Sequence, residues 1–511
     1  KAVLAGLLAL VLVAGFGFTR LGSEFMPSLW EGDLLYMPIT VPGISITAAS
    51  ELITKQGKAI KEIPEVETVF GKAGRYETAT DPAPLSMFEY TIRLKDRSAW
   101  RKGLSQEDLI SELDKAVEVP GLNRAWTKPI RGRIDMLSTG IRTPIGVKIY
   151  GKDLETIEHI GQQVERVLAK VKGTRSAYAE RIGGGYYIDF EPDRAALSRY
   201  GLNVGDAQMV VESAIGGMEV SQLIDGRERY SINVRYPREL RDSVEKLGRI
   251  LVSTPSGAQI PLGQLGKIVS RTGPPMVLNE NGSLAGYVYV DLQDRDPGSY
   301  VKDAKGAVAE EIKLPQGYFL QWTGQYEHLE RMQERMKIVL PLTLLLILAF
   351  LYFSMKSLER ALLIMISVPL SLIGGIFLMW ALGYNTSVAV WAGAIALIGV
   401  AVQTVSIMIV FLDEAWYRAK DTDRLTSVDE AIGSVVEGAQ KSLRPVLMAV
   451  GMNILGLIPV MAATGLGADV MKRISSPMFG GLVSLTLLTL VVIPVIYLLY
   501  EGRNLPRRRS A

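Results

Sequence analysis

The 511-residue sequence contains no cysteine and only two histidines, His159 and His328. Disulfides and thiolate metal sites are therefore excluded, and imidazole can come from only two positions. The sequence also lacks a G-x-x-x-x-G-K-[ST] phosphate loop, an H-E-x-x-H metal helix and a G-x-S-x-G nucleophile elbow. We predict that the chain is not an enzyme and has no prosthetic group. If it moves a solute uphill, the energy has to come from an ion gradient or from another subunit.

Charge is missing from three long stretches of the chain. Residues 361–412, 446–468 and 474–500 contain no Asp, Glu, Lys or Arg. About 20 apolar residues cross a bilayer, so the first stretch is long enough for two passes. Together with two further apolar runs, the sequence predicts six membrane helices, at residues 2–18, 338–353, 361–382, 386–412, 446–466 and 474–500.

Basic residues in the short loops predict the orientation of these helices. They cluster after the second span, between the fourth and fifth spans and in the tail: Lys356, Arg360, Arg418, Lys420, Arg424, Lys441, Arg444, Arg503, Arg507, Arg508 and Arg509. The positive-inside rule makes these segments cytoplasmic, so residues 21–337 lie outside, in the periplasm of a Gram-negative cell. We predict a multi-pass protein of the inner membrane. The net charge of +3 is too small to suggest a nucleic-acid partner.

The first apolar run could also be read as a signal peptide. No small-residue cleavage site follows it, and five more spans come later, which favours a membrane helix. Lys1 stands where an initiator Met would normally be. We therefore expect the chain to begin partway through a longer one.

The large loop alternates strand-like and helical segments, which predicts an α+β region of ferredoxin-like β-α-β subdomains. The predicted fold class is a polytopic α-helical membrane protein with this large periplasmic α+β region. The expected parts are a first membrane helix (1–20), a first periplasmic subdomain (21–140), a second one (141–192 and 276–330), an inserted module (193–275), five membrane helices (338–500) and a basic cytoplasmic tail (501–511).

Methionine is the remaining candidate for metal chemistry, because soft thioethers favour Cu(I) and Ag(I) over hard cations. Most of the 18 methionines, above all those in the spans, are expected to fill gaps in packing. Met37, Met87 and Met136 differ, because each lies in the large loop near charged residues. Their spacing alone does not bring them together.

Several runs in the loop resemble heavy-metal efflux pumps of the resistance–nodulation–division family. They are residues 31–38 (Glu-Gly-Asp-Leu-Leu-Tyr-Met-Pro), 70–72 (Phe-Gly-Lys), 77–81 (Glu-Thr-Ala-Thr-Asp), 129–136 (Pro-Ile-Arg-Gly-Arg-Ile-Asp-Met) and 137–141 (Leu-Ser-Thr-Gly-Ile). The chain is most similar to the C-terminal half of such a pump, from its seventh to its twelfth membrane helix, in the copper and silver branch.

The resemblance implies a function and a set of site residues. In that family three methionines in a periplasmic cleft bind Cu(I) or Ag(I), and the matching positions here are Met37, Met87 and Met136. Polar positions around the cleft also match, at Glu31, Asp81, Glu89 and Arg133. The resemblance further implies a homotrimer that works with the N-terminal half of the same pump, a periplasmic adaptor and an outer-membrane channel.

The membrane half departs from the family pattern. Family members use ionisable groups in the spans to couple transport to protons, but this chain has Gln403 and Val446 at two of those positions. Gln403 could instead make a hydrogen bond between helices. Asp413 and Glu414, at the cytoplasmic end of the same span, could serve as a proton exit, but solvated boundary charges are the favoured interpretation.

We therefore expect efflux of Cu(I) or Ag(I) by alternating access, driven by protons. The alternative is a metal-binding membrane subunit or scaffold that does not pump, as Gln403 and Val446 suggest. Export of an organic compound is a further option, and it would need an aromatic-lined cleft.

Overall fold

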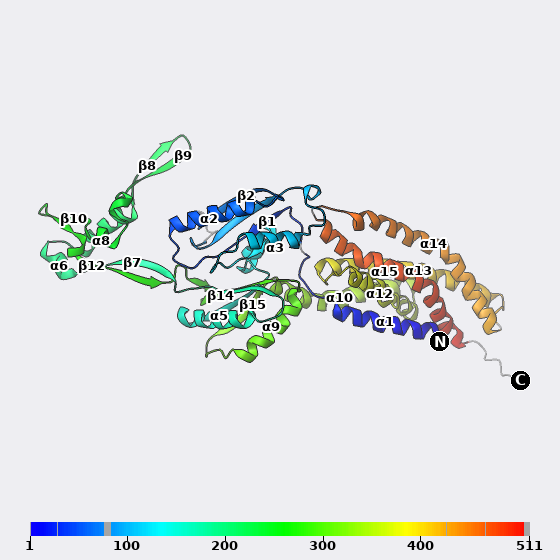
Figure 1. Ribbon diagram of the computed structural model, residues 1–511. Helices are drawn as coiled ribbons and strands as arrows, with labels where there is room; N and C mark the ends of the chain where they lie inside the picture. Colours follow the sequence, from blue (N-terminus) through cyan, green and yellow to red (C-terminus); the bar gives the residue numbers. More distant parts are fainter. Residues whose placement is uncertain (1, 28, 76–82, 426, 466, 505–511) are drawn as a thin grey trace. The chain divides into compact units, whose positions relative to one another are not determined.

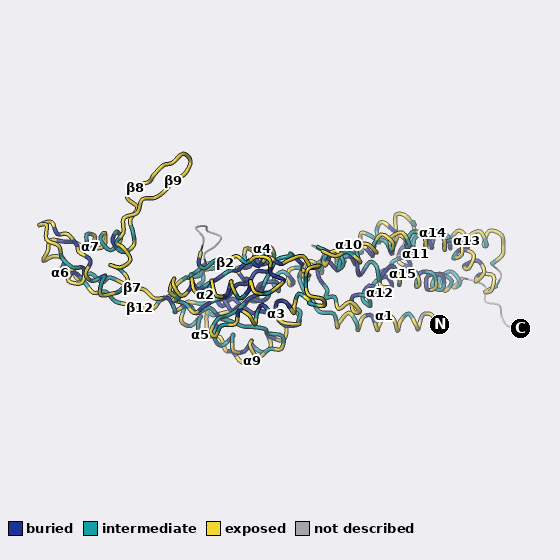
Figure 2. Tube along the Cα trace, turned by 45° about the horizontal axis from the view of Figure 1, so that its top comes forward, coloured by how far each residue is buried: buried dark blue, intermediate teal, exposed yellow. Residues whose placement is uncertain are grey.

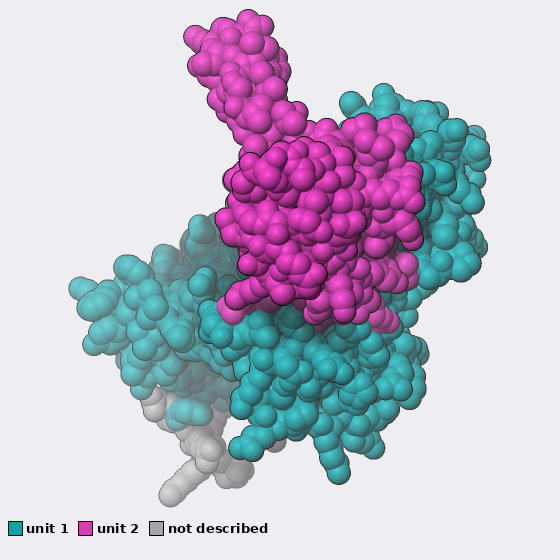
Figure 3. All heavy atoms as spheres, turned by 90° about the vertical axis from the view of Figure 1, so that its left-hand side faces the viewer, with its two compact units in different colours: residues 1–40, 46–180, 280–511 teal, residues 41–45, 181–279 magenta. Residues whose placement is uncertain are grey.

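The computed structural model describes residues 2–27, 29–75, 83–425, 427–465 and 467–504. The chain divides into two compact units, coloured separately in Figure 3. Unit 1 comprises residues 1–40, 46–180 and 280–511, and unit 2 comprises residues 41–45 and 181–279. The inserted module predicted at 193–275 falls within unit 2, and the predicted basic tail is described only as far as Asn504.

Among the described residues, unit 1 contains seven helices rich in apolar residues, one at the N-terminus and six between Gln325 and Glu501 (Figure 1). They are α1 (Ala2–Arg20), α10 (Gln325–Met355), α11 (Leu358–Met365), α12 (Ser367–Ala381), α13 (Val388–Asp421), α14 (Val428–Ala462) and α15 (Ala468–Glu501). In the part of the chain that the structure describes, five segments are long and apolar enough to cross a membrane, with α11 and α12 counted as one, which confirms five of the six predicted spans. The first predicted span is also helical, but its apolar part, Ala5–Arg20, is shorter.

One boundary in this region was predicted wrongly. The sequence places the start of the fifth span at 446, but α14 begins at Val428 and continues to Ala462 without interruption. Ser427 caps its start, with a side chain that accepts a hydrogen bond from the Glu430 amide. Pro445 lies inside the helix, where it removes one backbone hydrogen bond without ending the helix.

Close backbone contact holds the centre of the apolar bundle together. A Cβ added at Gly374 of α12 would lie 2.1 Å from the carbonyl oxygen of Gly480 in α15. The Gly374 amide also donates to Ser484 Oγ at 3.0 Å. Small residues that let helices approach this closely are typical of packing inside membranes. In contrast, most of the apolar surface of α10 and α14 is exposed, as lipid contact requires.

The first sheet of unit 1 has the order β2-β3-β1-β4, and every pair is antiparallel. Its strands are β1 (Asp33–Tyr36), β2 (Val66–Ala73), β3 (Phe88–Leu94) and β4 (Trp126–Thr127), with helices α2 (Ile46–Lys61) and α3 (Gln106–Ala116) between them in the chain. Tyr36 and Tyr90 are fully buried on one face. Gln56 of α2 bonds to both hydroxyls, so α2 covers that face.

The second sheet of unit 1 has the order β13-β14-β5-β15, and β6 also pairs with β14. Its strands are β5 (Ile145–Gly151), β6 (Thr174–Ala179), β13 (Leu278–Glu280), β14 (Ser283–Leu292) and β15 (Phe319–Gly324). Helix α5 (Leu154–Leu168) packs on β5, β6 and β14, and α9 (Pro297–Glu311) packs beside α5. Apolar residues at helical spacing on α5 supply much of this core.

Unit 2 has a small core of its own, built around Leu197, Leu247 and Leu262. Its elements are β7 (Gly185–Pro192), α6 (Arg194–Arg199), α7 (Val204–Val210), β8 (Met218–Asp225), β9 (Glu228–Val234), α8 (Val244–Gly248), β10 (Leu251–Ser253), β11 (Gln259–Pro261) and β12 (Gly266–Gly273). The hairpin of β8 and β9 is exposed along its whole length, which Figure 2 shows in yellow.

Candidate metal site and its supports

Strand pairing puts Met37 and Met87 on the same face of the first sheet. Tyr36 pairs with Tyr90, and the register continues to a bridge between Ile39 and Met87. Residues opposite each other in an antiparallel pair share a face, and so do residues two apart in a strand. Met37 is therefore a diagonal neighbour of Met87, and such neighbours lie about 7–8 Å apart, within reach of long side chains. Met37 is only 2% exposed, and Met87 is half-buried.

Helix α4 (Pro129–Thr139), which carries Met136, covers this face of the sheet. A Cβ added at Gly132 would lie 2.9 Å from Thr127 Cγ2 and 3.5 Å from Leu35 Cδ2. Leu35 is two residues before Met37, so it belongs to the face that carries the methionines. Met136 follows Gly132 by four residues and thus lies on the same side of α4. The structure brings the three methionine positions to two facing surfaces, although they are far apart in sequence.

The polar residues predicted around the cleft have different surroundings. The Glu31 carboxylate accepts hydrogen bonds from the backbone amides of Ile130 at 2.7 Å and Arg131 at 2.9 Å. It caps the N-terminus of α4, whose own N-cap residue, Lys128, makes no capping hydrogen bond with its side chain. Glu89 pairs with Lys72 at 3.3 Å.

Arg133 is exposed on α4, and Asp81 lies outside the described residues. Among the residues that the structure describes, no three His, Asp or Glu side chains are grouped to hold a metal ion.

Burial changes the titration of the charged groups on α4. It lowers the pKa of Lys128 to about 8, with a further decrease from Arg131. Burial also raises the pKa of Asp135. The positive charge of Arg131, whose Nε lies 3.9 Å from Asp135 Oδ2, partly offsets this increase. The N-terminal part of α4 and its N-cap therefore hold a partly dehydrated cluster of charges of both signs.

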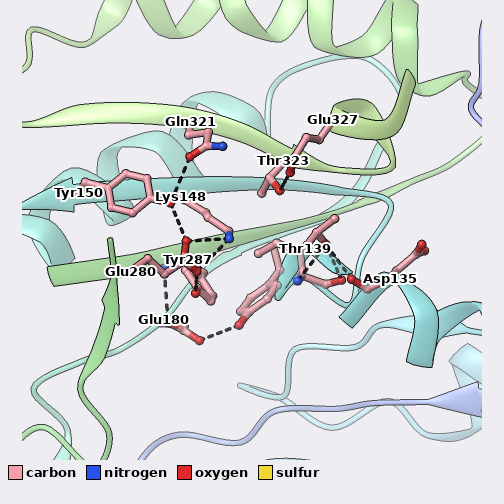
Figure 4. Close-up of polar contacts among 12 residues, drawn as sticks. Asp135, Thr139, Lys148, Tyr150, Glu180, Glu280, Tyr287, Gln321, Thr323 and Glu327 are labelled. Carbon is pink, nitrogen blue, oxygen red and sulfur yellow. Dashed lines mark hydrogen bonds and ion pairs between the residues drawn. The ribbon is translucent and has the colours of Figure 1, made fainter. Parts of the chain in front are cut away.

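The C-terminal end of α4 meets a hydrogen-bonded network on the second sheet, which Figure 4 shows. Lys148 Nζ lies 2.8 and 2.9 Å from the two carboxylate oxygens of Glu280. Glu280 also accepts from the hydroxyls of Tyr150, at 2.7 Å, and Tyr287. A Cβ added at Gly140, which ends α4 in a left-handed conformation, would lie 3.7 Å from Lys148 Nζ. The network thus abuts the last turn of α4 and connects β5, β13 and β14.

An open cavity of about 930 Å³ lies near the other end of α4. Glu31 and Asp33 line it together with Asp469 and Lys472 at the start of α15. None of the three methionines lines this cavity, so it is separate from the candidate metal site.

The residues of α10 that hold α4 in place were not identified from the sequence. Arg131 Nη2 donates to Gln325 Oε1 at 2.6 Å, and Gln325 Nε2 donates to Asp135 Oδ2 at 3.3 Å. Ser138 Oγ lies 3.2 Å from His328 Nε2. Nothing in the local sequence relates His328 to a helix residue 190 positions earlier.

The two positions that match the family's proton relay differ in burial. Gln403 is exposed on α13, whereas Val446 is fully buried on α14. Asp413, expected to be solvated, instead lies 3.1 Å from Arg360 Nε and accepts a hydrogen bond from Tyr497 at 2.7 Å. That expectation was wrong for Asp413. It holds for the exposed Glu414, which pairs with Arg418 on the same helix.

Long apolar helices joined to antiparallel sheets packed with helices define a polytopic membrane protein with a large α/β region. The chain belongs to the AcrB/AcrD/AcrF family, whose model matches residues 1–501. This confirms the resemblance to resistance–nodulation–division pumps, and with it the combination of α/β content and apolar helices.

Three relatives show how similar this chain is to individual members of the family. The chain is 43% identical to the cation efflux system protein CusA of Escherichia coli (strain K12) over 492 residues, which cover 95% of this chain and 47% of CusA. It is 43% identical to the putative cation efflux system protein SilA of Salmonella typhimurium over 94% of this chain and 46% of SilA. It is 34% identical to the nickel and cobalt resistance protein CnrA of Cupriavidus metallidurans over 96% of this chain and 45% of CnrA.

A crystal structure of a heavy metal efflux pump has a similar fold, with a TM-score of 0.88 and 29% identity. The match covers 98% of this chain and 50% of that one. The chain thus spans about half the length of the curated relatives it matches.

Proposed function

We propose that this chain forms part of an inner-membrane pump that exports Cu(I) or Ag(I), with Met37, Met87 and Met136 as the metal ligands. The observation that supports the proposal is the arrangement of β1, β3 and α4, because the three methionines belong to the facing surfaces of this sheet and helix. Neutral sulfurs suit a soft monovalent ion and add no negative charge that would trap it, so release stays possible.

The relatives support export of a metal cation. Identity is 43% to the two cation efflux system proteins and 34% to the nickel and cobalt resistance protein. In this proposal residues 21–337 are periplasmic. The two sheets of unit 1 belong to ferredoxin-like subdomains on either side of a cleft. The order β-α-β-β-α-β along the first sheet supports that description. Glu89 and Arg133 are assigned to the polar rim of the cleft.

Alternating access is the proposed mechanism, and protons are the proposed coupling ion. The pump is assigned as a homotrimer that includes an N-terminal half, a periplasmic adaptor and an outer-membrane channel. Because Gln403 and Val446 cannot titrate, a metal-binding subunit that does not pump is the second candidate. An assay in proteoliposomes that contain both halves distinguishes the pump from the subunit that only binds metal. It measures metal flux driven by an imposed pH gradient. Binding without gradient-driven flux would favour the second candidate.

Replacing Met87 by isoleucine tests the metal site directly. Loss of one of three ligands should raise the Kd for Ag(I) by more than the roughly 10–100-fold that removal of an outer-shell partner causes. The Kd is measured by calorimetric titration of the purified chain in detergent. Met209→Ile is the matched control, because Met209 is 59% exposed in unit 2. Equal Kd values for Met87→Ile, Met209→Ile and the unchanged protein would refute the assignment.

A further inference from the structure

Helix α10 begins without any linker after the second sheet. Strand β15 ends at Gly324, and α10 starts at Gln325. Gly324 has a φ of +80°, which makes the sharp change of direction possible, and the Gln325 amide donates to the Pro144 carbonyl at 2.9 Å. The same helix continues into an apolar segment that could cross a membrane. One continuous helix therefore connects this apolar segment to the turn beside the second sheet.

The first turn of α10 contacts one side of α4. Gln325, 9% exposed, bonds to both Arg131 and Asp135, and His328 one turn later contacts Ser138. Arg131, Asp135 and Ser138 are spaced by four and three residues, so they share a face of the helix. Gly132 and Met136 face the first sheet. The contacts with α10 therefore fix how α4 is rotated and tilted on that sheet.

The other support of α4 is the segment between α1 and β1. Glu31 caps the helix, and the Arg131 guanidinium donates to the carbonyl oxygens of Met26 and Pro27, each at 3.2 Å. Arg131 thus joins both supports, because its third hydrogen bond goes to Gln325. A change in the position of α10 relative to α1 has to move α4.

We propose that Gln325 and His328 are positioning residues that set the reach of Met136 toward Met37 and Met87, so that movement of α10 changes the affinity for the soft ion. This inference rests on the proposed function. Neither residue contacts the metal, because both act through α4. Outer-shell partners of this kind typically change metal affinity about 10–100-fold.

The test uses the full chain and Ag(I) as the probe. Gln325→Leu keeps a similar volume but removes both hydrogen bonds, and we expect the Kd for Ag(I) to rise about tenfold. Gln333→Leu, an exposed glutamine on the same helix, should leave the Kd unchanged. His328→Leu provides a second, independent variant and should also raise the Kd. Wild-type affinity in both Gln325→Leu and His328→Leu would overturn the proposal.

A double-mutant cycle separates positioning from a general loss of structure. If Gln325 acts through Met136, then adding Gln325→Leu to Met136→Ile should weaken binding no further. Independent, additive losses in the two variants would overturn the proposal. Failure of the proposed function is distinct, because Met136→Ile alone would then bind Ag(I) as tightly as the unchanged protein.

Discussion

Gly132 is the point at which the geometry of α4 can be perturbed without touching a proposed ligand. An added Cβ would lie 2.9 Å from Thr127 Cγ2 and 3.2 Å from Thr127 Oγ1. Carbon atoms in ordinary contact are about 3.5–4.0 Å apart, so α4 would have to move away from the sheet by about 0.6 Å or more. Thr127 lies in β4, which limits how far its side chain can yield.

The effects of Gly132→Ala on stability and on binding should differ in size. Overpacking typically costs about 1–3 kcal/mol, and alanine in place of glycine inside a helix contributes about 1 kcal/mol in the opposite direction. We therefore expect a net loss of about 0–2 kcal/mol in the free energy of unfolding. The Kd for Ag(I) should rise about tenfold, because α4 carries Met136 away from Met37 and Met87.

Gly57→Ala in α2 is the matched control. No atom lies within 4 Å of the added Cβ at that position. This variant should be more stable than the unchanged protein by up to about 1 kcal/mol and should bind Ag(I) normally. Thermal unfolding and calorimetric titration of both variants measure the two effects. If Gly132→Ala binds Ag(I) as tightly as Gly57→Ala, the placement of Met136 over the sheet is wrong.

Two further predictions concern stability. Burial raises the pKa of Asp291 to about 7, so the folded state holds a proton that the unfolded state releases near pH 4. Stability should therefore fall as pH rises from about 4 to about 7, by up to ~1.4 kcal/mol per pH unit. Asp291→Asn should remove that part of the dependence in melting curves, whereas Asp225→Asn in the exposed hairpin should retain it. Gly374→Ala should lower the melting temperature more than Gly399→Ala, since its Cβ meets the Gly480 backbone whereas no atom lies within 4 Å of a Cβ at Gly399; equal melting temperatures would contradict the close packing of α12 and α15.

Much of the membrane region could be predicted from the sequence, because a charge inside a bilayer is costly and its absence over 20 residues is a strong local signal. The boundary inside α14 was predicted wrongly, since Pro445 and the nearby charges resemble a helix end although the helix continues. The choice of soft ligands also follows from composition, because a chain without cysteine and with two histidines has few other groups for such an ion.

The relations between distant residues could not be predicted in this way. Asp413 was expected to be solvated because local sequence cannot reveal Arg360 and Tyr497, which approach it from two other helices. The same holds for Gln325 and His328 beside α4. For the candidate site, only the resemblance to a family related Met37, Met87 and Met136, and their joint role in binding a metal stays a prediction.

The sequence by itself determined where the chain can enter a membrane and which metal chemistry its side chains allow, since hydrophobicity and ligand softness are properties of single residues and short segments. Only the tertiary structure decided that α4 lies over the sheet face to which Met37 and Met87 belong, and which residues of α10 contact α4. These relations join residues that are far apart in the sequence. They depend on strand register, on the absence of a side chain at Gly132 and on the direct continuation of β15 into α10. Such contacts depend on how complete elements pack, and no local pattern specifies that packing.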